Sequence, residues 1–290
     1  MRRAKIVTDG TSELPPSVVQ QLGIEVLPVQ IKIQRQIVSE TPDMYAPAFH
    51  QANLRASVSP NMVPPSQDDF ASVYARLAKE TDRIISVHST AAGANTVIPA
   101  QRAAAGLLGR VHVDIVDCQF TSWPMGLIVQ EGARALADGA SGEQAVRLVR
   151  RLISRTYFAF YVDNLTALRT DHTEGVAIPR RSSANKAQPL LLLEDGKIVP
   201  QFAKRKKGPV LDRLVDFVSE FRQPEQLAIV HSGLMPDVVA LRDTLVEANY
   251  PFEEHIYGPP LASLIGPKAV GIVVLDKQPS QSSRGLILSR

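Results

Sequence analysis

The segment Arg83–Gln101, RIISVHSTAAGANTVIPAQ, is the part of the sequence that most constrains the fold. Its apolar run Ile84–Val87 predicts a buried strand, the small residues Ala91–Ala94 predict a tight turn, and a helix is expected from about Asn95. In open α/β sheets, ligands bind where strands end and helices begin, because unpaired N–H groups and the helix dipole attract anions there. The segment therefore predicts a site for an acidic head group, with an ordinary turn that binds no ligand as the alternative.

The first half of the chain alternates between strand-like and helix-like segments. Besides the strand just described, predicted strands cover Ala4–Thr8, Ile24–Ile33 and Val111–Val116. Predicted helices cover Pro16–Leu22, Asp43–Asn53, Gln67–Lys79, Met125–Leu136 and Glu143–Ile153. The proline-rich stretch Arg55–Ser66 predicts a loop, and Thr11 or Ser12 is expected to cap the first helix. This alternation predicts a three-layer α/β/α domain with a mostly parallel sheet over residues 1–155.

The second half mixes hairpins with helices. Asp195 and Gly196 lie between apolar flanks and predict the type I′ turn of a hairpin over Leu190–Val199. Further strands are expected at Tyr157–Val162, Leu227–His231, Phe252–Tyr257 and Ala269–Asp276, and helices at Val210–Phe221 and Pro236–Ala248. The pattern predicts a two-layer α/β domain with a mixed sheet over residues 156–278, followed by a tail over 279–290.

Composition excludes several classes of protein. The chain has 290 residues and a net charge of +3, which is too small to indicate a nucleic-acid-binding protein. Its basic runs, Lys204–Lys207 and Arg180–Arg181, predict solvent-exposed faces, with docking to an acidic partner as the alternative. The single cysteine, Cys118, excludes a disulfide framework and a thiolate metal cluster, and no apolar run reaches the ~18 residues of a membrane span. We therefore expect a soluble cytoplasmic protein.

Motifs of common enzyme classes are absent from the sequence. There is no GxSxG, HExxH, GxGxxG or GxxxxGK[ST] pattern, and the six histidines form no close-spaced pair suited to zinc. A Ser-His-Asp site built from Ser89, His231 and Asp9 has no support in the spacing. We expect no catalytic residue, no metal and no cofactor; a hydrolase that uses His88 or His231 is the enzymatic alternative.

Six motifs follow one another in register over nearly the whole chain. They are KIVTDGTSELP near the start, PSQDDF at Pro65–Phe70, ISVHSTAAGANT at Ile85–Thr96, IVDCQFTSWPMG at Ile115–Gly126, LLLEDGKIVP at Leu191–Pro200 and GPPLASLIGPKAVGI at Gly258–Ile272. In this order the chain resembles the DegV family of bacterial fatty-acid-binding proteins. The resemblance implies two α/β domains and one long-chain fatty acid buried between or beneath them. It also implies, for some members, a dihydroxyacetone-kinase-like partner that phosphorylates the acyl carboxylate, so the binding protein is not the catalyst.

The resemblance also indicates where the head-group chemistry departs from the family. The family holds the carboxylate with a threonine, a serine and a histidine, and these positions fall on Met62, Ala94 and Leu264. A family arginine falls on Thr173, although Arg169 is kept. The resemblance therefore predicts the fold of this chain more directly than it predicts how the chain would bind a head group.

The predicted ligand-binding positions combine the strand-end turn with these family positions. They are Thr11, Asn61, Met62, Ser89, Thr90, Ala94, Asn95, Thr96 and Leu264, with Ser263 as a further donor. Two ligands remain open: a long-chain fatty acid held by altered donors, or a less polar amphiphile. An alternative of another class is a degenerate family member that serves as an interaction or regulatory subunit, with an altered or empty pocket.

Overall fold

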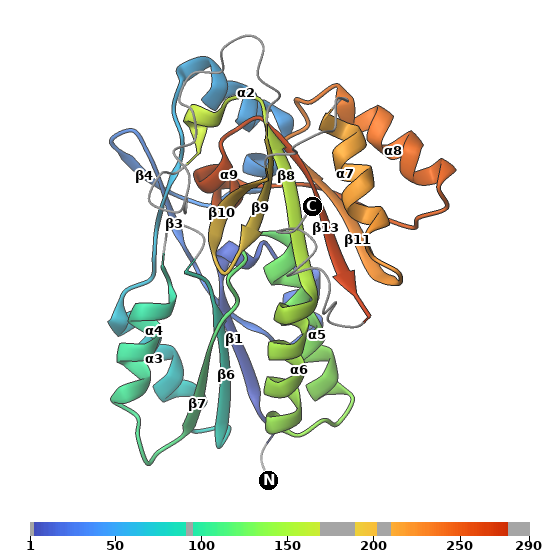
Figure 1. Cartoon of the computed structure of the whole chain (residues 1–290). Helices are drawn as coiled ribbons and strands as arrows, with labels where there is room; N and C mark the ends of the chain where they lie inside the picture. Colours follow the sequence, from blue (N-terminus) through green and yellow to red (C-terminus); the bar gives the residue numbers. More distant parts are fainter. Residues whose placement is uncertain (1–2, 91–94, 169–188, 202–209, 278–290) are drawn as a thin grey trace. The chain divides into compact units, whose positions relative to one another are not determined.

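The computed structural model describes residues 3–90, 95–168, 189–201 and 210–277. The chain forms two compact units (Figure 1). The first unit comprises Met1–Thr41, Pro60–Ile153 and Pro259–Leu261; the second comprises Pro42–Ser59, Ser154–Gly258 and Ala262–Arg290. The segment Pro42–Ser59 thus belongs to the second unit although it lies early in the sequence. The domain limits 1–155, 156–278 and 279–290 stay predictions.

Among the described residues, the first unit holds a four-stranded parallel sheet with the order β2-β1-β6-β7. Its strands are β1 (Lys5–Asp9), β2 (Glu25–Leu27), β6 (Arg83–His88) and β7 (His112–Asp117). Its helices are α1 (Pro16–Leu22), α3 (Gln67–Leu77), α4 (Val97–Ala105), α5 (Trp123–Ala137) and α6 (Gly142–Arg155), whose last residues pass into the second unit. The parallel sheet arises because each strand is followed by a crossover connection instead of a hairpin.

Helices cover both faces of this sheet (Figure 1). On one face, Val7 and Ile84 share a buried cluster with Phe70 of α3 and Ala100 of α4. On the other face, α5 approaches both β1 and α6, and a Cβ on Gly132 would lie 3.1 Å from Ile6 and 2.7 Å from Val149. The predicted three-layer α/β/α arrangement is confirmed.

A second, antiparallel sheet in the first unit has the order β4-β3-β5 and corrects two predictions. Its strands are β3 (Gln30–Ile33), β4 (Gln36–Ser39) and β5 (Asn61–Val63). The segment Ile24–Ile33 was predicted as one strand but forms β2 and β3, which belong to different sheets, because Pro28 between them has no N–H for a ladder. The predicted loop Arg55–Ser66 contains β5, whose register with β3 is a tertiary contact.

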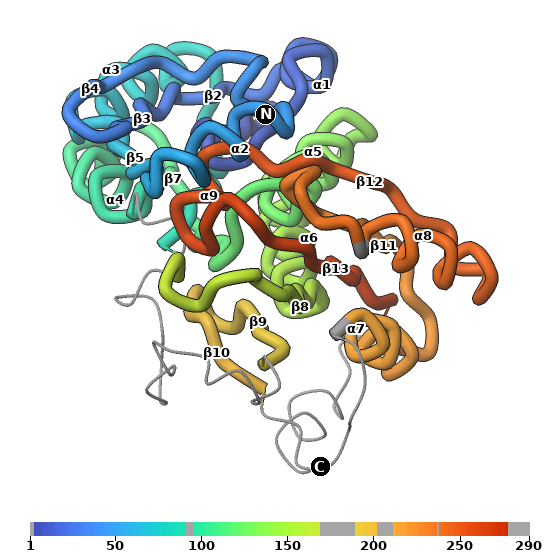
Figure 2. Tube along the Cα trace, turned by 90° about the horizontal axis from the view of Figure 1, so that it is seen from above, coloured from blue at the N-terminus to red at the C-terminus, as the bar shows by residue number. Residues whose placement is uncertain are grey.

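Within the ranges that the structure describes, the second unit holds a six-stranded mixed sheet with the order β10-β9-β8-β13-β11-β12. Its strands are β8 (Thr156–Val162), β9 (Leu190–Glu194), β10 (Lys197–Gln201), β11 (Pro224–His231), β12 (Glu253–Ile256) and β13 (Ala269–Asp276). Its helices are α2 (Pro47–Ala56), α7 (Val210–Ser219) and α8 (Asp237–Glu247); α9 (Pro259–Ile265) is shared between the two units. Figure 2 shows the strands following one another across this unit.

The second unit has the predicted two-layer, mixed-sheet form. Leu214 of α7 and Leu241 of α8 pack with Ile229 and Ile272 on one face of the sheet. Among the described strands of this unit, β11 and β12 pair in parallel and the other pairs are antiparallel. In the predicted hairpin turn, Asp195 and Gly196 both have positive φ, 48° and 77°, as a type I′ turn requires.

Short 3₁₀ turns complete the described elements, at Gly10–Ser12, Pro42–Tyr45 and Leu165–Ala167. None of the helices in the described ranges is long and apolar enough to cross a membrane. The basic runs Arg180–Arg181 and Lys204–Lys207 and the predicted tail lie outside the described residues.

Candidate functional site

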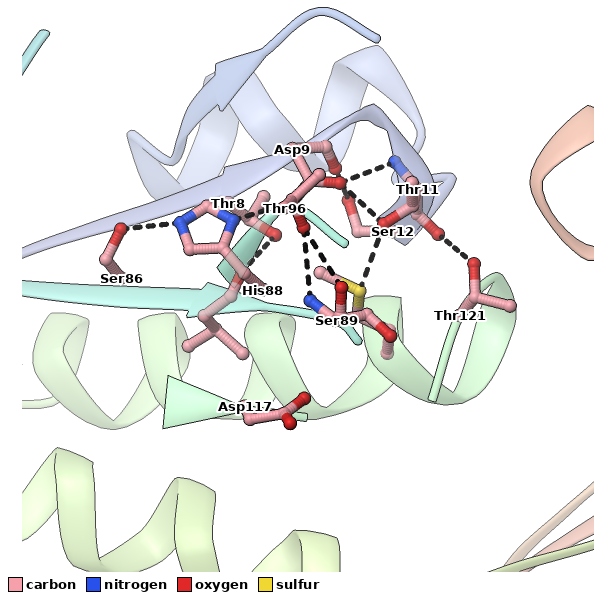
Figure 3. Close-up of polar contacts among 12 residues, drawn as sticks. Thr8, Asp9, Thr11, Ser12, Ser86, His88, Ser89, Thr96, Asp117 and Thr121 are labelled. Carbon is pink, nitrogen blue, oxygen red and sulfur yellow. Dashed lines mark hydrogen bonds and ion pairs between the residues drawn. The ribbon is translucent and has the colours of Figure 1, made fainter. Parts of the chain in front are cut away.

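A chain of buried polar side chains runs across the sheet of the first unit to the end of β1 (Figure 3). His88 Nδ1 lies 2.6 Å from Asp9 Oδ2, and His88 Nε2 lies 2.7 Å from Ser86 Oγ. Ser86 Oγ is in turn 2.7 Å from the hydroxyl of Tyr74 on α3. All four side chains are buried. This series of hydrogen-bonded side chains therefore links β1, β6 and α3 in the interior.

Asp9 is the charged end of this chain. Burial alone would raise the pKa of its carboxyl group, but the hydrogen bond and electrostatic attraction of His88, with hydrogen bonds from Thr11 and Thr96, outweigh burial and lower the pKa below its ordinary 3.8. Asp9 is therefore an ionised carboxylate at neutral pH.

The order Ser86–His88–Asp9 is that of a Ser-His-Asp triad, but its surroundings differ from those of a hydrolase. The Ser86 hydroxyl is completely buried and already bonds Tyr74, while the ring of Phe70 packs edge-on against His88 with centroids 4.9 Å apart. A nucleophile needs access to its substrate. Sequence reasoning considered Ser89 for this role and missed Ser86, although the pattern S-x-H in a buried strand places both side chains on one face.

Thr11 and Ser12 act on the turn after β1. The backbone N–H and the hydroxyl of Thr11 donate to Asp9 Oδ1 at 3.0 and 2.5 Å, and the Ser12 hydroxyl donates to the Asp9 carbonyl at 2.8 Å. The prediction that either residue caps the first helix is wrong, because the N-cap position of α1 is Pro15. The turn at Gly10–Ser12 is instead capped by the Asp9 side chain, and the Thr11 and Ser12 hydroxyls donate back to Asp9.

The turn between β6 and α4 holds most of the predicted head-group positions. The N–H and hydroxyl of Thr90 donate to Asp117 at 3.2 and 2.8 Å, and Thr96 Oγ1 accepts from the Ser89 N–H at 3.2 Å. Asn95 has a φ of 38°, and its Oδ1 is buried without a hydrogen-bond partner in the described part of the chain. The two carboxylates at the strand ends, Asp9 and Asp117, are thus already hydrogen-bonded to neighbouring groups, and Asn95 Oδ1 is the buried acceptor left without a described partner.

In the second unit, α2 buries a polar pair that sequence reasoning missed. The sequence predicted a helix over Asp43–Asn53 but not which of its side chains are buried; Ala48 and Ala52 are exposed, and the buried side chains of α2 are His50 and Asn53. Among the described residues, His50 Nδ1 and Asn53 Nδ2 have no hydrogen-bond partner. The signal for this pair in the sequence was the i, i+3 spacing of two polar residues on a predicted helix.

His231, the second histidine considered for catalysis, has a structural environment. Its Nδ1 accepts from the Gly233 N–H at 2.9 Å, and its Nε2 lies 3.0 Å from Glu254, which also bonds Arg242. Burial lowers the pKa of His231 despite the opposing attraction of Glu254. This histidine therefore holds the end of β11 to β12.

A family model described as an uncharacterised protein of the DegV family matches residues 3–277. The chain belongs to the DegV family. The resemblance seen in the six motifs is thereby confirmed. A DegV domain-containing protein of Deinococcus radiodurans is 26% identical over 274 residues, which cover 93% of this chain and 97% of that protein.

Solved structures of DegV proteins share the fold. A DegV family protein from Thermus thermophilus, described in terms of fatty acid binding, is 25% identical, with a TM-score of 0.77 over 95% of this chain and 100% of that one. A fatty acid binding DegV family protein from Streptococcus agalactiae has a TM-score of 0.82 over 96% and 100% of the two chains. At 20% identity, the second comparison shows the fold alone.

Two of the positions that the family resemblance predicts for the head group are buried and apolar. Met62 on β5 is 6% exposed, and Leu264 on α9 is completely buried. Asn61 and Met62 are strand neighbours and point to opposite faces, so only one of them can line a given pocket. Leu264 belongs to the second unit, and Thr11, Asn61, Met62, Ser89, Thr90, Asn95 and Thr96 to the first. Ala94, Arg169 and Thr173 lie outside the described residues.

The described residues contain no group of three His, Cys, Asp or Glu side chains that could hold a metal ion. Cys118 is a free, buried cysteine, and burial raises the pKa of its thiol.

Proposed function

We propose that this DegV protein binds one long-chain fatty acid or a similar amphiphile and does not chemically transform it. The observation that carries the proposal is the family match over residues 3–277. It is supported by the Thermus thermophilus relative, which is described in terms of fatty acid binding and shares the fold over 95% of this chain.

Transfer energetics support retention of the acyl chain even where the head-group residues have changed. Burying about fourteen methylenes contributes roughly 11 kcal/mol before association entropy is subtracted, at about 0.8 kcal/mol each. Each hydrogen bond to a carboxylate adds only about 1.5–3 kcal/mol. Apolar side chains at Met62 and Leu264 remove donors but leave the larger contribution intact.

The predicted ligand positions enter this proposal as candidates for the pocket lining. The hydroxyls of Thr11 and Thr90 already serve Asp9 and Asp117, so their substitution tests the turn as well as the ligand. The backbone N–H groups at the start of α4 remain candidates for an acidic head group.

Lipid extraction tests the proposal directly. Protein purified under native conditions is extracted with solvent, and the extract is analysed by mass spectrometry beside an extract of an unrelated protein purified in the same way. We expect one class of long-chain lipid near one equivalent per chain. Delipidated protein should melt at a higher temperature with palmitate or oleate. An empty extract, with no stabilisation by either acid, would refute the proposal.

A second candidate function is that of an interaction or regulatory subunit whose pocket is filled by its own side chains. The burial of Met62 and Leu264 favours it, because both replace polar family residues. Its candidate partner is a dihydroxyacetone-kinase-like protein of the cytoplasm. Capture of such a kinase by delipidated protein, together with an empty extract, would favour this function over lipid binding.

Catalysis by the protein itself is tested at the triad-like chain. Because the Ser86 hydroxyl is buried and bonded to Tyr74, we expect no ester hydrolysis above background. A measurable rate with p-nitrophenyl esters that disappears in both Ser86→Ala and His88→Ala would contradict a purely binding role.

A further inference from the structure

The buried face of α2 is polar where an apolar face is the usual solution. His50 is 0% exposed and Asn53 is 6% exposed, and they are the buried residues of this helix. Residues spaced i, i+3 lie one above the other on a helix, so the two side chains share one face. The helix therefore presents an imidazole and an amide together, and their atoms His50 Nδ1 and Asn53 Nδ2 are buried.

The hydrogen bond to Tyr257 fixes the roles of the His50 ring nitrogens. Nε2 lies 2.7 Å from the Tyr257 carbonyl oxygen, which can only accept, so Nε2 carries the proton. Burial lowers the pKa of His50 to about 4, so the ring is neutral near pH 7 and Nδ1 is an acceptor. The ring also packs edge-on against Tyr257 with centroids 4.8 Å apart, which holds its orientation.

Nδ1 of His50 and Nδ2 of Asn53 therefore form an acceptor and a donor on one helix face. Within the described residues neither atom has a hydrogen-bond partner. Leaving a buried polar group unpaired destabilises the folded protein, and a second such group adds to the loss. Replacing Asn53 with leucine or alanine would remove the part of this destabilisation that comes from the unpaired amide.

The polar pair is not needed to attach this segment to its unit. Tyr45 packs so closely on Gly258 that a Cβ there would lie 2.4 Å from the tyrosine ring, and Pro47 packs on Gly233 with a corresponding distance of 2.5 Å. These contacts and the His50 Nε2 bond already fix the start of α2 in the second unit. The unpaired atoms of His50 and Asn53 are therefore available to a ligand.

We propose that His50 and Asn53 bind the un-ionised hydroxyl group of an amphiphile. The ligand O–H donates to His50 Nδ1, and its oxygen accepts from Asn53 Nδ2, so one hydroxyl satisfies both atoms. An ionised carboxylate fits less well, since it has no proton to give and would place its lone pairs against that of Nδ1. This inference rests on the proposed lipid-binding function and assigns the ligand to the chemical class of fatty alcohols and monoacylglycerols.

Calorimetry on delipidated full-length protein tests the inference, with dodecan-1-ol and dodecanoate as probes at pH 8. The wild type is compared with Asn53→Leu and with Gln51→Leu, a control on the same helix. We expect wild type and Gln51→Leu to bind dodecan-1-ol equally, and Asn53→Leu to bind it about tenfold more weakly. Dodecanoate affinity should differ little between the three proteins. Without ligand, Asn53→Leu should melt no lower than the wild type, because a buried unpaired amide has been removed.

The two probes separate this inference from the proposed function. If dodecanoate binds and Asn53→Leu leaves dodecan-1-ol affinity unchanged, the hydroxyl site is refuted while lipid binding stands; an ordered water then satisfies the pair. If neither probe binds the wild type, the lipid-binding function fails and the inference fails with it. Loss of stability in ligand-free Asn53→Leu would also overturn the inference, since it would show a structural role for the amide.

Discussion

The buried ring of His50 makes the stability of this DegV protein depend on pH in a defined window. Folding lowers the pKa of His50 from 6.5 to about 4, mainly through burial, with a smaller contribution from the charge of His231 and an opposing one from the Tyr257 carbonyl. The unfolded chain therefore binds a proton more readily than the folded chain. The folding stability that is linked to the pKa of His50 is therefore fully present above pH 6.5 and is lost as the pH falls toward 4.

The size of the effect follows from the two pKa values. At 1.36 kcal/mol per pH unit, linkage through His50 removes about 2 kcal/mol of stability between pH 7.5 and pH 5, and about 3 kcal/mol by pH 4. Asp9 has a lowered pKa, so it contributes with the same sign, but only below its ordinary value of 3.8. His231 also has a lowered pKa and shares the upper part of the window.

His50→Gln isolates the contribution of one ring. Glutamine keeps an N–H for the Tyr257 carbonyl but does not titrate, while Asp9 and His231 are common to both proteins. In urea unfolding, we expect the variant to be less stable than the wild type at pH 7.5 and the gap to shrink by about 2 kcal/mol at pH 5. In histidine-labelled wild type, the resonance that the variant lacks should not titrate above pH 5. A ring that titrates near 6.5, or a gap that stays constant, would refute this reasoning.

Three further predictions concern other parts of the molecule. Asp9→Asn should lower the free energy of unfolding in urea by about 3 kcal/mol, because Thr11 and His88 lose the carboxylate to which they bond. A loss below about 1 kcal/mol would contradict a stabilising role for these buried hydrogen bonds. Gly258→Ala should destabilise the protein by about 1–3 kcal/mol, because its Cβ meets the ring of Tyr45, and Tyr45→Ala in the same chain should restore part of the loss. Cys118 should resist iodoacetamide in the native protein and react fully in urea, as followed by mass spectrometry, because its buried thiol has a raised pKa; rapid native labelling would show that the site opens.

Local chemistry let the sequence predict individual elements. The Asp195–Gly196 turn formed as predicted because two adjacent residues that tolerate positive φ suit a type I′ turn. The span Ala269–Asp276 was predicted as a strand to the residue, since a continuous apolar run buried on both faces has few other solutions. The family motifs indicated the two-unit α/β fold for the same reason: each motif marks a local strand end or turn.

Tertiary pairing decided what local pattern could not. The segment Ile24–Ile33 has one apolar pattern, but its halves pair with β1 and β5 in different sheets, and no local signal distinguishes those partners. For the same reason the hydrogen-bonded series from Asp9 through His88 and Ser86 to Tyr74 was not predicted, because its bonds join residues 79 and 12 positions apart whose meeting depends on tertiary packing.

The sequence by itself therefore determined the alternating elements, their turns and the family, since these depend on neighbours within a few residues. The three-dimensional structure decided which polar groups are buried and which of them find partners. His50 and Asn53 illustrate the difference. In the sequence they are two polar residues of a predicted helix, and only the packing of α2 onto its unit buries them. Burial sets the cost of an unpaired hydrogen-bonding group, and burial is a property of the whole chain.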